Sequence, residues 1–371
     1  MIKIAYIIYS MSNSGGMERG LTTRANMLCD VFDITIITEH QNGEPYFFPL
    51  DKRIKTIDIN IIAKGKRKEI KQDCKIKLTS LLKEKKYDIV ISLGGMEMFF
   101  LHDIHDGSKK VLDSRFSYDV LKLFMQKAMP GLKGKVYGHI YTIWRNYHAR
   151  KFDHIVVQCK EDCQRWKRFT RKVSFIHNSL TLKSTKTSKC ENHKAIAIGR
   201  LEYQKGFDYL IDTWNKVNEK YPDWTLEIYG EGILRNKLQI QIDSLGHTDV
   251  ISMPGKTENV AEKLAKASIY VLSSREEGFP NVVIEAEQCG LPIVSFACPY
   301  APAVLEGRNG FIVKPVGNLK LLEDRICKLI DDEKLRKAMG SESKRISQNY
   351  LPEMIKPQWV SLFKSLCSDT Q

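Results

Sequence analysis

The sequence of 371 residues lacks any apolar run long enough to cross a membrane. Its longest runs, such as Ile89 to Leu93, fall far short of the ~20 residues that a spanning helix needs. Residues 1–10 are predicted to form a first strand rather than a signal peptide. Because these signals are absent, we expect a cytoplasmic protein.

Paired cysteines are also absent. The nine cysteines are scattered, and Cys159 and Cys163 lack a second pair of ligands at a spacing that suits zinc. Scattered cysteines in a cytoplasmic protein are typically reduced thiols. No Asp-x-Asp triplet occurs either. The sequence therefore predicts neither disulfides nor a metal site.

The G-x-G-x-x-G fingerprint of dinucleotide-binding proteins is missing as well, so no nicotinamide or other cofactor is expected. A first strand within residues 1–9 leads instead into a loop with two adjacent glycines, Gly15 and Gly16, followed by a helix to about Phe32. Adjacent glycines before a helix let backbone N–H groups approach a phosphate closely. An ordinary strand-to-helix turn is the alternative.

Acidic residues are scarce in the first half of the chain. Residues 1–180 contain 32 Lys and Arg against 19 Asp and Glu, whereas residues 181–371 contain 26 against 25, so the first half holds +13 of the net charge of +14. Such asymmetry indicates an anionic surface or ligand on one side. From Val120 to Phe152 there is no acidic residue at all. The segment interleaves cations with aromatic and other apolar side chains: Lys122, Lys127, Lys133, Lys135, Arg145, Arg150 and Lys151 among Phe124, Met125, Tyr137, Tyr141, Trp144 and Tyr147.

This basic and aromatic composition suits an anionic membrane interface. The alternative is that the aromatic side chains form core and the lysines form a solvated face. No nucleic-acid-binding motif accompanies the charge, so no nucleic-acid partner is expected. A second basic run, Lys64 to Lys77, is predicted to lie between a strand and a helix.

Length and hydrophobic content suffice for two domains, each with its own core. Apolar strands alternate with helical segments in both halves, which predicts an α/β fold of two doubly wound parallel sheets. In the first half we expect strands at about residues 33–37, 54–58 and 88–92, and a helix at about 75–86. The polar stretch from Thr181 to Asn192 is linker-like, so we place the domains at 1–180 and 181–350, with a last helix in 351–371.

The most informative stretch runs from Ser274 to Gly290. An apolar strand ends before it, Gly278 and Pro280 break the backbone, and a helix begins near Asn281. A helix N-terminus presents free N–H groups and partial positive charge to an anion. Carboxylates beside it, at Glu277 and Glu285, are suited to accept hydrogen bonds from hydroxyl groups. Phosphate together with hydroxyls describes a nucleotide sugar.

A second motif follows the first strand of the second half, in Gly-Arg-Leu-Glu-Tyr-Gln-Lys-Gly at residues 199–206. It places a guanidinium at Arg200 and an ammonium at Lys205, five residues apart across a turn. A planar guanidinium and a point-charge ammonium can bracket a pyrophosphate and neutralise it as a leaving group.

Together these motifs resemble the retaining glycosyltransferases of family four, which have the GT-B fold. Glu277-Gly278-Phe279-Pro280 followed by Glu285 matches the family's signature of a glutamate, seven residues and a second glutamate. Residues 199–206 match its phosphate clamp. The resemblance covers almost the whole chain and is densest in 194–313.

The resemblance implies two Rossmann-like domains facing across a cleft, with the acceptor on the first, the nucleotide sugar on the second, and the last helix crossing back to the first. It implies metal-independent transfer, with retention, of a hexosyl or N-acetylhexosaminyl group from a nucleoside diphosphate sugar such as a UDP-sugar to a saccharide acceptor. That acceptor is expected to be lipid-linked, as in bacterial surface polysaccharide or lipopolysaccharide synthesis. The enzyme would then work at the inner face of the cytoplasmic membrane.

The resemblance also assigns roles to residues. Glu277 would hold hydroxyls of the donor sugar and Glu285 the ribose, while the leaving phosphate would assist deprotonation of the acceptor in a front-face displacement. The expected catalytic residues are Glu277, Arg200, Lys205 and Arg115. The expected substrate-binding residues are Gly15, Gly16, Arg200, Lys205, Gly230, Lys256, Glu277, Gly278, Phe279, Pro280, Asn281, Val282 and Glu285.

Two departures from the family pattern matter. Asp113-Ser114-Arg115-Phe116 stands where many relatives have a histidine, and Ala301 replaces a glycine in Cys-Pro-x-Gly-Pro. Two other functions stay open, and the missing histidine keeps the second of them possible. One is a GT-B nucleotide-sugar epimerase or hydrolase, and the other is a catalytically silent binding partner in polysaccharide assembly.

Overall fold

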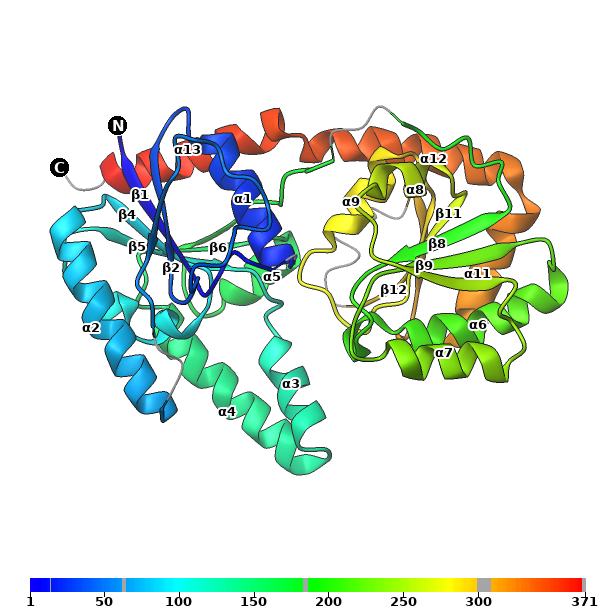
Figure 1. The fold of residues 1–371 in the computed structure, drawn as a ribbon, viewed down its shortest axis with the longest axis horizontal. Helices are drawn as coiled ribbons and strands as arrows, with labels where there is room; N and C mark the ends of the chain where they lie inside the picture. The colour runs from blue at the N-terminus through cyan, green and yellow to red at the C-terminus, as the bar shows by residue number, and fades with distance from the viewer. Residues whose placement is uncertain (14, 62–64, 183–185, 299–307, 369–371) are drawn as a thin grey trace. The chain divides into compact units, whose positions relative to one another are not determined.

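The computed structural model describes residues 1–13, 15–61, 65–182, 186–298 and 308–368. The chain divides into two compact units. The N-terminal unit comprises Met1–Ser179 together with Pro352–Gln371, and the C-terminal unit comprises Leu180–Leu351. Figure 1 shows that each unit is a β-sheet with helices packed on its faces.

The N-terminal unit is built on a seven-stranded sheet with the order β3-β2-β1-β4-β5-β6-β7, in which neighbouring strands pair in parallel. Strands of a parallel sheet that is covered on both faces are buried on both sides, which is why they read as continuous apolar runs in the sequence. The strands are β1 (Lys3–Ile8), β2 (Asp33–Thr38), β3 (Lys55–Asp58), β4 (Ile89–Ser92), β5 (Lys109–Ser114), β6 (His154–Val157) and β7 (Val173–Phe175).

Helices cover both faces of this sheet. The last helix of the chain packs on the N-terminal unit, where Phe363 meets Phe32 edge to face with ring centroids 5.6 Å apart. Its Trp359 ring lies 4.3 Å below the guanidinium of Arg24. The helices are α1 (Gly16–Leu28), α2 (Arg67–Lys85), α3 (Val120–Ala128), α4 (Leu132–Ala149), α5 (Lys160–Trp166) and α13 (Pro352–Ser368), with short 3-10 turns at Met96–Phe99 and Leu101–Asp103.

Two helix boundaries in this unit differ from the prediction. Helix α2 begins at Arg67, eight residues before the predicted start, so the basic run from Arg67 onward lies within the helix and not between a strand and a helix. A capping box at Glu69, whose carboxylate accepts from the backbone N–H of Lys66 at 3.1 Å, stabilises this early start. Lys64 lies outside the described residues. Helix α1 ends at Leu28 rather than near Phe32.

The C-terminal unit is built on a six-stranded parallel sheet with the order β10-β9-β8-β11-β12-β13. Its two faces carry separate apolar cores, one of them centred on the fully buried Trp214. The predicted class of two doubly wound α/β domains is thus confirmed. The strands are β8 (Lys194–Ile198), β9 (Thr225–Tyr229), β10 (Ile251–Gly255), β11 (Ile269–Leu272), β12 (Ile293–Phe296) and β13 (Gly310–Val313). The helices are α6 (Phe207–Lys220), α7 (Arg235–Ser244), α8 (Val260–Ala265), α9 (Asn281–Gln288), α11 (Leu319–Asp331) and α12 (Glu333–Ser347).

A pair of acidic side chains is buried in the N-terminal unit, at the carboxyl ends of β2 and β4. Glu39 accepts a hydrogen bond from the Cys74 thiol at 3.5 Å, and Glu97 accepts one from Ser92 Oγ at 2.6 Å. Burial, and then the negative charge of Glu97, raise the pKa of Glu39 to about 8. The pair therefore holds a proton at neutral pH.

The proton held by Glu39 and Glu97 makes the stability of the N-terminal unit depend on pH. The folded pKa of Glu39, about 8, lies above the ordinary value of 4.5, so the stabilisation is complete at acidic pH and is lost as the pH rises towards 8. We expect the free energy of urea unfolding to fall by a few kcal/mol between about pH 5.5 and about pH 8.5. Glu39→Gln should flatten this dependence, whereas Glu44→Gln on the surface should not. Equal stability of the wild type at both pH values would show that the pair is ionised.

Candidate active site

The order of strands in the C-terminal sheet changes direction between the neighbouring strands β8 and β11. These strands are neighbours, yet the chain proceeds from β8 outward through β9 to β10, and from β11 outward through β12 to β13. Loops that leave the carboxyl ends of such a pair lead in opposite directions. Ligands of open α/β sheets bind at this point, which is called the switch point of the sheet. The loop after β8 carries Arg200 and Lys205, and the loop after β11 carries Glu277.

The structure joins these two loops through a salt bridge. Lys205 Nζ lies 2.7 Å from Glu277 Oε1, and Ser274 Oγ donates to the same oxygen at 2.6 Å. The side chains of Lys205 and Glu277 are only 16% and 6% exposed. Hydrogen bonds between charged groups at such sheltered positions are shorter and stronger than neutral ones. Two of the predicted site residues, far apart in sequence, are thus in direct contact.

Backbone geometry holds the two loops close enough for this contact. Gly206 adopts a left-handed conformation with φ of +62°, and a Cβ there would lie 2.2 Å from the carbonyl oxygen of Ser273. Only glycine fits that approach. Ser273 Oγ in turn donates to the Lys205 carbonyl at 2.9 Å.

Arg275 binds the same two loops together, and the sequence analysis missed it. Its guanidinium makes two bonds to Asp208, at 2.8 and 2.6 Å, and donates to the Tyr203 carbonyl at 2.7 Å. It also lies over the rings of Tyr203 and Tyr209, 4.1 and 3.9 Å from their centroids. Its position inside the stretch from Ser274 to Gly290 was a signal, but its partners lie about seventy residues earlier in the chain.

The second signature carboxylate, Glu285, lies in the second turn of α9 and is buried. Its Oε1 accepts a hydrogen bond from Thr181 Oγ1 at 2.9 Å. Tyr270 of β11 lies near both signature carboxylates: burial raises the pKa of this phenol well above its ordinary value, and the charges of Glu277 and Glu285 raise it further. The Tyr270 phenol is therefore neutral, and its hydroxyl donates to the Ile198 carbonyl at 3.5 Å. The sequence analysis missed this residue too.

Arg200 differs from Lys205 in its surroundings. Its side chain is 63% exposed, and Nη1 pairs with Glu202 at 3.0 Å on the same loop. The loop that follows β8 thus carries one mostly buried cation, Lys205, and one exposed cation, Arg200.

Comparison with known proteins identifies the family. Residues 181–346, which contain the site just described, match the family of glycosyl transferases group 1. An uncharacterized glycosyltransferase of Haemophilus influenzae is 30% identical over 370 residues, spanning 98% of this chain and 100% of that protein. This chain belongs to the group 1 glycosyltransferases.

Other similarities extend over the whole chain. A Campylobacter jejuni protein, named as an N-acetylgalactosaminyltransferase that acts on a saccharide linked to undecaprenol, is 26% identical over 98% of this chain and 98% of its own length. HepE of Anabaena, crystallised with UDP and glucose, has a TM-score of 0.78 at 17% identity, covering 98% of this chain and 100% of that one. At this identity the structural likeness shows the fold, which is GT-B.

The other residues of the C-terminal unit that were predicted to bind the donor follow β9, β10 and β11. Gly230 has a φ of +146°, and a Cβ there would lie 1.8 Å from the Gly199 carbonyl oxygen, so glycine alone permits the close approach of the β8 and β9 ends. Lys256 is exposed directly after β10. The loop leading into α9 contributes the half-buried Gly278, the buried Phe279 and Pro280, and then Asn281 and Val282 in the first helical turn. Ala301 lies outside the described residues.

Three predicted residues belong to the N-terminal unit. Gly15 caps α1 and Gly16 begins it; the carboxylate of Glu18 occupies the space beside Gly15, where a Cβ would lie 2.3 Å from its Oε2. Arg115 is buried, and its Nε donates to Asp113 Oδ2 at 2.7 Å. Arg24 reaches the same oxygen at 2.6 Å. Burial alone would raise the pKa of Asp113, but the two guanidinium groups hold it below its ordinary value.

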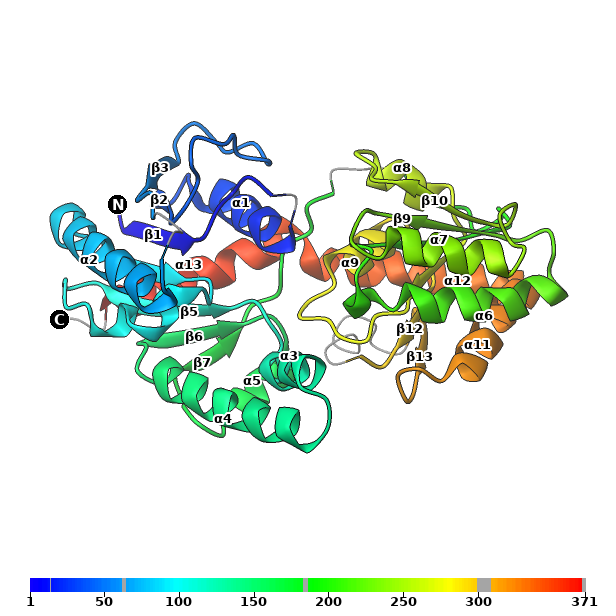
Figure 2. The same cartoon turned by 60° about the horizontal axis from the view of Figure 1, so that its bottom comes forward.

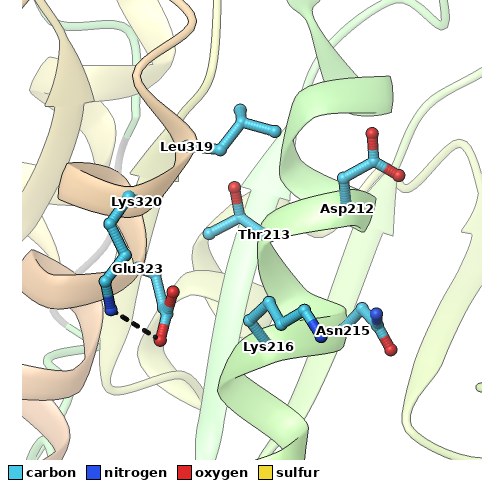
Figure 3. Close-up of a pocket in the computed structure, with 7 residues that line it drawn as sticks. All are labelled: Asp212, Thr213, Asn215, Lys216, Leu319, Lys320 and Glu323. Carbon is cyan, nitrogen blue, oxygen red and sulfur yellow. Dashed lines mark hydrogen bonds and ion pairs between the residues drawn. The ribbon is translucent and has the colours of Figure 1, made fainter.

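Figure 3 shows a surface pocket elsewhere in the C-terminal unit, between α6 and α11. Its walls include Thr213, Lys216 and the pair Lys320 and Glu323, whose Nζ and Oε1 atoms lie 3.4 Å apart. None of the predicted site residues lines it. In the described parts of the chain, no helix is long and apolar enough to span a membrane, and His, Cys, Asp and Glu side chains form no cluster of three or more that could bind a metal ion.

The contacts of Arg275 predict a measurable effect on the site's scaffold. Arg275→Ala should destabilise the C-terminal unit by about 1–3 kcal/mol, because Asp208 keeps its charge and loses its bidentate partner. Arg275→Lys should recover only part of this loss, because an ammonium cannot reproduce the planar fork. Urea unfolding followed by circular dichroism measures both, with the exposed Lys334→Ala as the control. A loss no greater than in that control would contradict the proposed bracing role.

Proposed function

We propose that this protein is a retaining glycosyltransferase of family four that transfers a hexosyl or N-acetylhexosaminyl group from a UDP-sugar to a saccharide on a lipid carrier. The observation that carries the proposal is the contact between Lys205 and Glu277 at the switch point of the C-terminal sheet. It pairs a cation suited to a diphosphate with a carboxylate suited to sugar hydroxyls, immediately before the N-terminus of α9.

Donor binding would exchange the partners within this salt bridge. In the structure Glu277 balances the charge of Lys205. A bound diphosphate, which carries more negative charge than one carboxylate, would attract Lys205 and release Glu277 to accept hydrogen bonds from the donor sugar. The exposed Arg200 would close on the diphosphate from solvent. The first turn of α9, with Asn281 and Val282, adds backbone N–H groups.

The chemistry proposed is a front-face displacement. The bond between the anomeric carbon and the diphosphate oxygen breaks, and the acceptor oxygen bonds to the same face of that carbon. The acceptor's proton passes to the departing phosphate oxygen, so atoms and charge balance without a further reactant. Lys205, Arg200 and the helix N-terminus would stabilise the negative charge that develops on the leaving diphosphate.

The remaining donor contacts follow from position. Glu285, which accepts from Thr181 in the structure, would take the ribose hydroxyls. Gly230 and Lys256 follow β9 and β10 and would border the nucleobase through their backbone groups.

The N-terminal unit would supply the acceptor side. Gly15 and Gly16 begin a helix whose N-terminus suits a phosphate, and Arg115 would act by holding the β5 tip through Asp113 rather than by touching substrate. The undecaprenol-linked acceptor in the name of the Campylobacter jejuni relative supports a lipid carrier here. The charge of +13 in residues 1–180 supports a position against the anionic inner face of the cytoplasmic membrane.

Substitution of Lys205 and Arg200 tests the proposed binding of the diphosphate. A donor screen by mass spectrometry, with and without a polyprenyl-linked sugar, first identifies the donor; consumption without any acceptor would point instead to an epimerase or hydrolase. Lys205→Ala and Arg200→Ala should each lower kcat/KM by about 30- to 1,000-fold, or ~2–4 kcal/mol of transition-state stabilisation. Lys216→Ala, an exposed lysine on α6, is the control. Unchanged kcat/KM in both variants would remove the clamp from the mechanism.

Chelation of metal ions tests the source of positive charge. Because side chains and a helix N-terminus supply it in the proposed mechanism, EDTA should leave the rate of transfer unchanged. Loss of activity that only magnesium or manganese restores would contradict the proposal.

A further inference from the structure

Helix α4 carries its apolar side chains on the outside. Its buried residues are small or polar, namely Gly134, Gly138, Thr142, Arg145, Asn146 and Ala149. Its outward stripe consists of Leu132, Val136, Ile140, Ile143 and Tyr147, which are 77%, 48%, 53%, 67% and 49% exposed. Spacings of four, four, three and four residues place all five on one side of the helix. We call these five residues the outer stripe. A surface helix of a globular protein normally has the opposite arrangement.

Close packing and buried hydrogen bonds on the inward side of α4 fix the rotation of the helix about its axis. Gly138 packs so tightly against α3 that a Cβ there would lie 2.8 Å from the Cα of Lys122. Arg145 donates to the Tyr118 carbonyl at 2.9 Å, and Asn146 donates to the Tyr118 hydroxyl at 2.5 Å. Turning the outer stripe inward would break these buried hydrogen bonds.

Aromatic side chains border the outer stripe. Tyr137 and Tyr141 are more than 40% exposed, and so is Trp144, which stacks on Phe99 with ring centroids 4.1 Å apart. Such amphipathic rings favour the boundary between water and lipid. Figures 1 and 2 show α3 and α4 as a helical hairpin extending from the N-terminal sheet.

The charges around the outer stripe favour anionic lipid as its partner. Lys127, Lys133 and Lys135 are exposed on the hairpin, and residues 120–152 contain no acidic side chain. Asp119, at the foot of the hairpin, is already paired with Lys122 and Arg165. A second copy of this face would meet it with the same positive charge, whereas anionic lipid complements it.

We propose that α4 lies in the plane of an anionic bilayer and inserts the outer stripe into the headgroup boundary. The inference rests on the proposed function in one respect, because a lipid-linked acceptor gives the enzyme a reason to be there. It goes further by naming the inserting element and by making apolar insertion, as well as charge, a source of affinity.

Vesicle co-sedimentation tests the insertion. The wild type should bind vesicles of phosphatidylcholine mixed with phosphatidylglycerol, and bind phosphatidylcholine alone much less. Ile140→Gln with Ile143→Gln should weaken binding by about tenfold or more, since both side chains leave water on insertion. The matched control is Ile233→Gln with Ile240→Gln, two exposed isoleucines of the C-terminal unit. Lys127, Lys133 and Lys135 changed to Glu should also release the protein.

Tryptophan fluorescence reports where the contact lies. Trp144 is 41% exposed, whereas the other four tryptophans are at most 3% exposed. Its emission should shift to the blue on binding, and Trp144→Phe should abolish the shift while most of the binding remains.

Three results would overturn the proposal: equal binding to both kinds of vesicle, unchanged binding of the Ile140→Gln, Ile143→Gln variant, or a wild-type dimer that this variant dissolves. Calorimetry with UDP tests the proposed function separately from membrane insertion. The double variant should keep the wild-type affinity for UDP. A protein that binds vesicles through α4 but no nucleotide would refute the donor assignment alone.

Discussion

The salt bridge between Lys205 and Glu277 depends on how the C-terminal sheet is ordered. Only because β8 and β11 are neighbours do two loops separated by some seventy residues meet at one point. Taking both charges out of water is costly, and the pair persists because Ser274 adds a hydrogen bond and the loops are held from both sides. In the proposed mechanism, the more highly charged diphosphate takes the place of Glu277 as the partner of Lys205.

The surrounding residues serve that contact. Gly206 and Gly230 let backbones approach to distances that any side chain would prevent, and Arg275 ties the loop after β11 to the start of α6. Tyr270 places a neutral phenol near two carboxylates, whose charges disfavour a further negative charge there. These contacts hold the two loops together, whereas the Arg200 side chain is 63% exposed and pairs with Glu202 on its own loop.

Most of the fold could be predicted from sequence, because strands buried on both faces are continuous apolar runs and helical segments alternate with them. The start of α2 could not, since a lysine-rich run resembles a loop and only the capping contact of Glu69 reveals a helix. In the site, Lys205 and Glu277 were found through motifs. Arg275 and Tyr270 were missed because their roles come from partners distant in the chain. For α4 the composition indicated an interface, but only the fold decides which side chains face outward.

The place of α13 has a consequence for the order in which the protein is made. The C-terminal unit is one continuous stretch of chain, so all its strands have been synthesised before the last helix emerges. The N-terminal unit begins first but includes Trp359 and Phe363 in its core. Until those residues leave the ribosome, the surface formed by Phe32 and its neighbours stays uncovered. The half of the molecule that is translated first is therefore the half that is completed last.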